Sequence, residues 1–303
     1  MRRIGAAAAL IVASCATVPP TSLQPQIAIT VDDLPVHGSY PPGVTPQQVS
    51  LEMIAAFQAA GITAVTGFVN GVKVDDQPDT EQVLENWRSA GMMLGNHGWS
   101  HRSLSAMSVA EFEHELVKNE PLLARTAGQS DTRWFRYPFL DEGRDADQRV
   151  DARAVLAKHG YRVAAVSTSF GDWQWTAPYA RCTARHDAPA VAELERMYLA
   201  AAKESIAVSR DGARKLLGRD IPYVLLMHVS AMSAHMMPQL LGMYRQAGFR
   251  FVTLSQAEGD PAYDAYIDLK LSPPPLPQEL ARQRGVKLMR ATDYAPKLER
   301  MCV

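Results

Sequence analysis

Seven short runs rich in β-branched and aromatic residues alternate with longer stretches of helical apolar spacing, and this alternation constrains the fold most. The predicted strands are residues 27–31, 63–69, 92–95, 133–137, 162–167, 223–227 and 250–254. Most of them are continuously apolar, as expected for strands that are buried on both faces. The pattern predicts an α/β protein with a parallel sheet, which could be an open doubly wound sheet or a closed barrel.

Helical patterns occupy the stretches between these runs. The predicted helices are residues 47–60, 80–90, 109–125, 147–159, 190–217 and 234–247. Several of them are followed by a glycine, which is favoured just past a helix C-terminus. Because no proline- or glycine-rich linker interrupts residues 27–260, we predict a single domain there, with residues 261–303 as a C-terminal arm.

The first residues indicate export. A basic start and an apolar run at residues 5–13 predict a signal peptide over residues 1–14, because this run is too short to span a bilayer. Val12-Ala13-Ser14-Cys15 resembles a bacterial lipobox, so we expect a lipid on Cys15 and a tether over residues 15–26; ordinary cleavage nearby is the alternative. In both cases the mature protein is expected in the periplasm or cell envelope.

Three cysteines are too few to build a disulfide scaffold. If Cys15 carries lipid, Cys182 and Cys302 are left as a possible pair in an oxidising compartment. The sequence alone leaves a disulfide and two separate thiols equally open, since it does not show their distance.

Ionisable residues stand at the carboxyl ends of several predicted strands. They are Asp32 and Asp33 after the first strand, His97 after the third, Arg136 in the fourth, Asp172 beyond the fifth and His228 after the sixth. In parallel α/β folds these ends meet at one rim, where catalytic groups lie. One such carboxylate often only caps a helix, but packing does not account for all of these residues together.

His97 and His101 are four residues apart, which places both imidazoles on one face if residues 99–103 begin a helix. With Asp33 they form the two-histidine, one-carboxylate set of catalytic zinc sites, which leave one position for water. We therefore predict one divalent metal ion, zinc first, with cobalt, nickel or iron compatible with the same ligands. The other histidines lack such a context; they are His37, His114, His159, His186 and His235.

Other classes of function lack their sequence signals. Residues 98–102 miss the last glycine of a Gly-x-Ser-x-Gly nucleophile elbow, and the chain has neither a glycine-rich phosphate loop nor His-Glu-x-x-His. A formal net charge of −1 argues against nucleic acid or an anionic membrane surface as partner. Metal-assisted hydrolysis is the reaction class that remains.

In their order along the chain, five motifs resemble the signature of the polysaccharide deacetylases. These enzymes form carbohydrate esterase family 4, which includes the NodB-like chitooligosaccharide deacetylases. The motifs are Thr30-Val31-Asp32-Asp33, His97-Gly98-Trp99-Ser100-His101, Arg136-Tyr137-Pro138-Phe139, Asp172-Trp173 and Leu226-Met227-His228. The resemblance spans residues 27–228 and implies a distorted (β/α)7 barrel that reaches residue 260, so it favours closure of the predicted sheet.

The resemblance also implies roles for the motif residues. Asp32 would be the general base, oriented by Arg136, and His228 would be the general acid, with its charge tuned by Asp172. The remaining implied roles are metal binding by Asp33, His97 and His101, oxyanion binding by the main-chain N–H of Phe139, and an acetyl pocket walled by Trp173 and Leu226.

Three residues depart from the usual motifs: Val31 replaces phenylalanine, Phe139 replaces tyrosine, and Gly98 replaces serine or threonine. None of them removes a catalytic group, but Gly98 predicts a less rigid loop between the two histidines.

The implied activity is metal-dependent removal of acetyl groups from N-acetylated glycans, such as chitooligosaccharides or peptidoglycan, by an activated water. Cleavage of O-acetyl esters on xylan or an exopolysaccharide is the alternative, and a lipid-anchored protein that binds glycans without catalysis is a further one. Aromatic residues on the loops of the rim are expected to stack on sugar rings; they are Tyr40, Trp99, Trp173, Trp175 and Tyr179. For Trp175 and Tyr179, plain packing within the loop is an equally open alternative.

Overall fold

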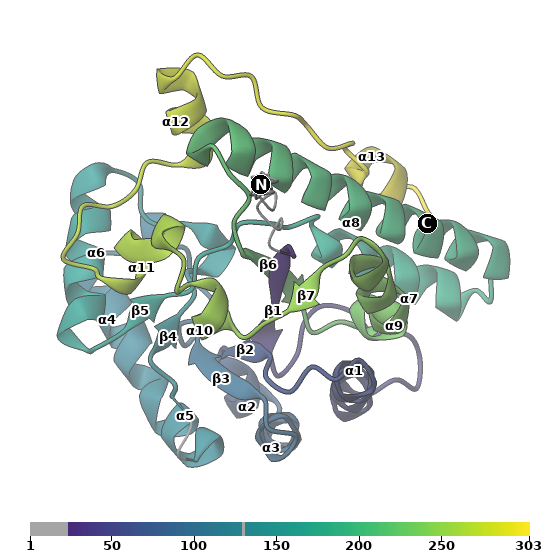
Figure 1. Ribbon diagram of the computed structural model, residues 1–303. Helices are drawn as coiled ribbons and strands as arrows, with labels where there is room; N and C mark the ends of the chain where they lie inside the picture. The colour runs from purple at the N-terminus through teal and green to yellow at the C-terminus, as the bar shows by residue number, and fades with distance from the viewer. Residues whose placement is uncertain (1–23, 129–130) are drawn as a thin grey trace, which may run out of the picture.

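The computed structural model describes residues 24–128 and 131–303, and a curved parallel sheet lies at its centre with helices around it (Figure 1). The strands are β1 (Gln26–Leu34), β2 (Thr66–Val69), β3 (Met93–Asn96), β4 (Trp134–Phe135), β5 (Arg162–Val163), β6 (Tyr223–His228) and β7 (Arg250–Phe251). Every predicted strand is present, although β4, β5 and β7 are only two residues long. The predicted parallel α/β class is confirmed.

The strand order is β5-β4-β3-β2-β1-β6, and β7 pairs with the start of β1 through Gln26 and Arg250. An isolated parallel bridge joins Thr168, beyond β5, to Leu225 in β6. This bridge connects the two ends of the strand order, so the sheet curls back on itself. The distorted (β/α)7 barrel implied by the resemblance is therefore confirmed.

β1 is the central strand of this barrel. Eight of its nine residues are buried, and it pairs with β2 on one side and β6 on the other. Its register with β6 places Asp32 directly opposite His228. Sheet pairing therefore makes neighbours of two motif residues that lie far apart in the sequence.

The helices surround the strands and cover their apolar side chains. They are α1 (Pro46–Ala59), α2 (Val72–Asp76), α3 (Glu81–Ser89), α4 (Val109–Lys118), α5 (Glu120–Ala127), α6 (Ala146–Lys158), α7 (Thr176–Ala184), α8 (Ala188–Leu217), α9 (Ala231–Gln246), α10 (Leu254–Ala257), α11 (Asp264–Ile267), α12 (Pro277–Gln283) and α13 (Ala295–Leu298). The predicted helix over residues 109–125 is thus two helices that meet at Asn119. Pro121 explains the break, because a proline lacks the N–H that would continue the preceding helix but fits the first turn of a new one.

The C-terminal arm runs along α8 and ends beside α7 (Figure 1). Cys182 and Cys302 form a disulfide with Cα atoms 5.2 Å apart, which decides the question that the sequence left open. Cys182 lies within α7. The guanidinium of Arg181, also in α7, donates to the main-chain oxygen of Met301 at 3.0 Å, so the arm is held by hydrogen bonds as well.

The predicted signal peptide and the lipidated Cys15 lie outside the described residues, as does most of the predicted tether; Gln26, its last residue, already begins β1. In the two described ranges, no helix is both long enough and apolar enough to span a membrane.

Candidate active site

The polar residues predicted from the strand ends converge at one rim of the barrel. Asp32 and Asp33 lie near the end of β1, His97 follows β3, Arg136 follows β4, Asp172 begins a 3₁₀ turn beyond β5, and His228 ends β6. Because all these strands are parallel, their carboxyl ends share a face. The rim thus gathers acidic, basic and imidazole groups that the chain carries far apart.

Asp33, His97 and His101 form a cluster with the spacing of a metal site. Asp33 Oδ1 lies 3.6 Å from His97 Nε2 and 3.2 Å from His101 Nε2. Two ligand atoms at 2.0–2.2 Å from a tetrahedral ion are about 3.3 Å apart, so these separations fit one shared ion. Among the described residues none donates a hydrogen bond to this buried oxygen. A buried carboxylate oxygen that lacks a donor fits a cation-binding role.

The surroundings of His97 and His101 favour the neutral form of both imidazoles. His97 Nδ1 lies 2.8 Å from the main-chain oxygen of Arg136, so it carries the proton and donates, and Nε2 keeps its lone pair. Burial lowers the pKa of His97 to about 3, and burial also lowers the pKa of His101. Neutral imidazole is the form that binds metal ions.

Residues 99–103 do not begin a helix, so the condition under which the four-residue spacing would place both imidazoles on one helix face is not met. Residues 97–103 form an irregular loop, in which Gly98 has φ +72° and His101 has φ +54°. Asn70 Nδ2 donates to the main-chain oxygens of His97 and Gly98 at 2.8 and 3.0 Å, and Asn96 Oδ1 accepts from Gly98 N at 2.9 Å. These side-chain amides brace the loop, although position 98 has no side chain to do so.

Asp32 lies beside this cluster in a different environment. The Arg136 guanidinium, 1% exposed, lies 3.3 Å from Asp32 Oδ2 and also donates to Thr30 Oγ1 at 3.0 Å and to Ala164 O at 2.8 Å. Burial raises the pKa of Asp32 to about 6, although the charge of Arg136 opposes this shift. Asp32 is therefore a carboxylate that can accept a proton near neutral pH.

His228 is paired with a fully buried carboxylate. Asp172 Oδ1 lies 2.9 Å from His228 Nδ1, and Asp172 Oδ2 accepts from His228 N at 2.8 Å and from Ser233 Oγ at 2.9 Å. Although burial alone would lower it, the charge and hydrogen bond of Asp172 raise the pKa of His228 to about 9. The imidazolium is thus the stable form of His228 at neutral pH.

The residues predicted for the acetyl pocket lie at the rim, whereas one of the aromatic residues predicted there, Trp175, is buried. Phe139 and Trp173 are 69% and 54% exposed, and Leu226 lies on β6 just before the His228 end. Trp175 is 1% exposed and packs against Tyr198, so of its two alternatives packing is the one that the structure shows.

Sequence reasoning missed two residues of the site. His37 Nδ1 lies 2.5 Å from Asp33 Oδ2, so the interpretation of His37 as a histidine without context is corrected. Lys73 Nζ lies 3.6 Å from Asp33 Oδ1 and donates to the main-chain oxygen of Val36 at 2.8 Å. The hydrogen bond from His37 and the charge of Lys73 hold the pKa of Asp33 well below its usual range, despite burial, which would raise it. His37 follows Asp33 by four residues, the spacing of His97 and His101, and this was the one available signal.

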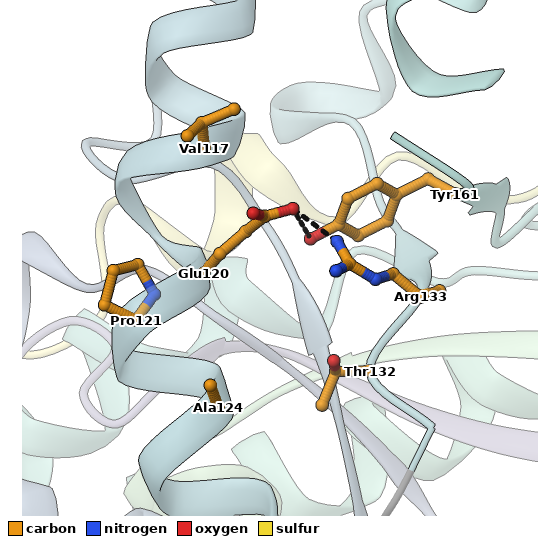
Figure 2. A pocket seen from close by; sticks show the side chains of 7 residues that line it. All are labelled: Val117, Glu120, Pro121, Ala124, Thr132, Arg133 and Tyr161. Carbon is orange, nitrogen blue, oxygen red and sulfur yellow. Dashed lines mark hydrogen bonds and ion pairs between the residues drawn. The ribbon is translucent and has the colours of Figure 1, made fainter. Parts of the chain in front are cut away.

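A separate hollow lies against α4 and α5, with a cavity volume of about 290 Å³ (Figure 2). Three of its polar side chains are paired with one another: Glu120 Oε1 accepts from Tyr161 Oη at 3.2 Å and from Arg133, as the dashed lines mark. None of the predicted site residues lines it.

Comparison with known proteins gives a match to one family model and a likeness to one fold. Residues 20–164 match the family model described as polysaccharide deacetylase. An uncharacterised 30.6 kDa protein of Geobacillus stearothermophilus is 28% identical over 109 residues, which is 36% of this chain and only 38% of that relative.

Solved structures with similar folds include a carbohydrate esterase family 4 pseudoenzyme from Bacillus anthracis, at 13% identity and a TM-score of 0.55 over 78% of this chain and 66% of that one. A deacetylase solved with substrate has 19% identity and a TM-score of 0.51, with 78% and 92% covered. The esterase domain of a xylanase from the hindgut metagenome of Trinervitermes trinervoides has 16% identity and a TM-score of 0.50, with 78% and 90% covered. At these identities the likeness shows the fold.

The curled (β/α)7 barrel of this chain has the same fold as solved structures of carbohydrate esterase family 4. The matched residues contain the Asp32-Asp33, His97–His101 and Arg136–Phe139 motifs, whereas Asp172 and His228 lie beyond them on the same barrel. The match of residues 20–164 to the polysaccharide deacetylase model agrees with the resemblance of the motifs.

Proposed function

We propose that this protein is a metal-dependent deacetylase that hydrolyses acetamido groups on N-acetylated glycans. The single observation that carries the proposal is the position of Asp33 Oδ1, which is buried without a hydrogen-bond donor among the described residues and lies 3.6 and 3.2 Å from His97 and His101 Nε2. The proposal also rests on two titratable pairs beside this cluster, Asp32 with Arg136 and His228 with Asp172.

Asp33, His97 and His101 would hold one divalent ion. Two imidazoles and one carboxylate suit zinc, and they also accept cobalt, nickel or iron. Such an ion, when bound, polarises a carbonyl and makes water more acidic.

Asp32 is proposed as the general base that takes the proton of the attacking water. Its pKa of about 6 leaves it ionised at neutral pH while keeping it basic enough to accept a proton. Arg136 fixes the direction of this carboxylate, because its other donors are held by Thr30 and Ala164.

His228 is proposed as the general acid that protonates the departing amine. An amide needs this proton because a free amide anion leaves very poorly, whereas an activated ester does not need it. Asp172 keeps His228 Nδ1 occupied, so Nε2 is the atom from which the proton leaves.

The acetyl group is proposed to lie between Trp173 and Leu226, with the main-chain N–H of Phe139 facing the developing oxyanion. Removing one such donor typically costs about 2.7–4 kcal/mol of transition-state stabilisation. The glycan itself would lie outside this pocket, against the exposed rim.

The test is acetate release from chitooligosaccharides, peptidoglycan and acetylxylan, combined with elemental analysis of bound metal. We expect close to one divalent ion per chain, acetate from an N-acetylated glycan, and loss of both in Asp33→Ala. His114→Ala, on the exposed face of α4, is the matched control.

Acetate from acetylxylan alone would replace the amide proposal with the O-acetyl esterase alternative. A wild-type protein that binds metal but releases no acetate from any substrate would contradict the catalytic proposal and favour a glycan-binding role.

A further inference from the structure

The two carboxylate oxygens of Asp33 face different groups. Oδ1 faces His97 and His101, and Oδ2 faces Nδ1 of His37 at 2.5 Å. The side chain of Asp33 is buried, and His37 is partly exposed at the mouth of the site. Asp33 thus has one oxygen toward the proposed ion and one toward a histidine that belongs to no motif.

His37 could in principle be a ligand of a second ion, since Asp33, His37 and His228 also lie close together. The distance argues against this, because two ligand atoms of one tetrahedral ion are about 3.3 Å apart. A separation of 2.5 Å is that of a short hydrogen bond.

The loop that carries His37 is fixed on both sides. Lys73 Nζ donates to the main-chain oxygens of Asp33 and Val36 at 3.3 and 2.8 Å. Gly38, the next residue, has φ +70°, and a Cβ there would lie 2.6 Å from Cγ2 of Thr176. The position of the imidazole is therefore set by tertiary packing around a backbone turn that requires glycine.

We propose that His37 is a positioning residue, which donates a hydrogen bond from Nδ1 to Oδ2 of Asp33 and thereby directs Oδ1 toward the metal ion. This proposal rests on the proposed function, because it concerns the same metal site. Partners that orient a ligand in this way typically change metal affinity 10–100-fold when removed. In most zinc sites a carboxylate orients a histidine ligand, whereas here a histidine orients the carboxylate ligand.

The experiment measures the dissociation constant of Zn²⁺ by competition with a chromophoric chelator, and the visible spectrum of the Co²⁺-loaded protein. His37→Ala is expected to weaken Zn²⁺ binding 10–100-fold while the Co²⁺ spectrum keeps its shape. His37→Asn, whose amide N–H₂ stands close to the place of Nδ1, is expected to restore most of the affinity, whereas His37→Gln is not.

Unchanged affinity in His37→Ala would overturn the proposal. A changed Co²⁺ spectrum with no rescue by asparagine would overturn it as well, because His37 would then be a ligand. If the alanine variant does not fold, the comparison of the asparagine and glutamine variants decides alone. Failure of the proposed function is distinguishable, since the wild-type protein would then bind no stoichiometric Zn²⁺ or release no acetate.

Discussion

Asp33 follows Asp32 directly in the chain, yet the pKa values of the two carboxyl groups are shifted in opposite directions. Asp32 faces Arg136 within the barrel, and burial raises its pKa to about 6. Asp33 has φ +69°, which turns its side chain toward His37, His97 and His101, and its pKa is held well below the usual range. Neighbouring carboxylates with separated pKa values suit separate tasks, proton transfer for Asp32 and cation binding for Asp33.

The proposed acid predicts a split between substrates. His228→Ala is expected to lower kcat for an N-acetylated chitooligosaccharide by about 10²–10⁴-fold, because the leaving amine loses its proton donor. Hydrolysis of 4-nitrophenyl acetate should fall far less, since nitrophenolate leaves without a proton. Steady-state rates on both substrates check this, with His114→Ala as the unaffected control. An equal loss on amide and ester would contradict the acid role of His228.

Glu258, which follows α10, predicts a pH dependence of stability. Its Oε1 accepts from Ala165 N at 2.7 Å, no described residue donates to its buried Oε2, and burial raises its pKa from 4.5 to about 8. A carboxyl group with a raised folded pKa contributes stability below its unfolded pKa and loses that contribution as the pH rises through the folded pKa.

Glu258→Gln keeps the acceptor for Ala165 and removes the charge. We expect the free energy of unfolding of this variant, relative to wild type, to rise by roughly 2 kcal/mol or more between pH 5 and pH 9. Urea unfolding at both pH values measures it. Asp32 and His228 titrate in both proteins, so the difference isolates Glu258, and a difference that does not change with pH would contradict the prediction.

The disulfide predicts a stability that depends on redox conditions. Cys182 and Cys302 are 120 residues apart, so their bond removes much freedom from the unfolded chain. Cys302→Ser is expected to lose about 2–5 kcal/mol of unfolding free energy. Thermal unfolding with and without dithiothreitol provides the check: the reductant should lower the Tm of wild type and leave that of the variant unchanged. A wild-type Tm that is insensitive to full reduction would contradict this expectation.

The order of apolar runs and the residues that end them were sufficient to predict the seven parallel strands and the rim that gathers Asp32, His97 and His228. Strand burial depends on local apolar content, and the carboxyl ends of parallel strands must share a face, so both follow from sequence pattern. Pro121 was an available sign of the break between α4 and α5 that the periodicity of residues 109–125 concealed.

Tertiary structure alone decided which residues fix the positions of the site's side chains and which cysteines pair. His37 reaches Asp33 because Lys73 and Thr176, from other elements, fix its loop, and no periodicity in the sequence encodes such contacts. The pairing of Cys182 with Cys302 required the arm to lie along α8. The local sequence pattern thus determined which side chains end the strands. Long-range packing determined which atoms of these side chains face one another, because distances of a few ångströms depend on contacts between segments that lie far apart in the chain.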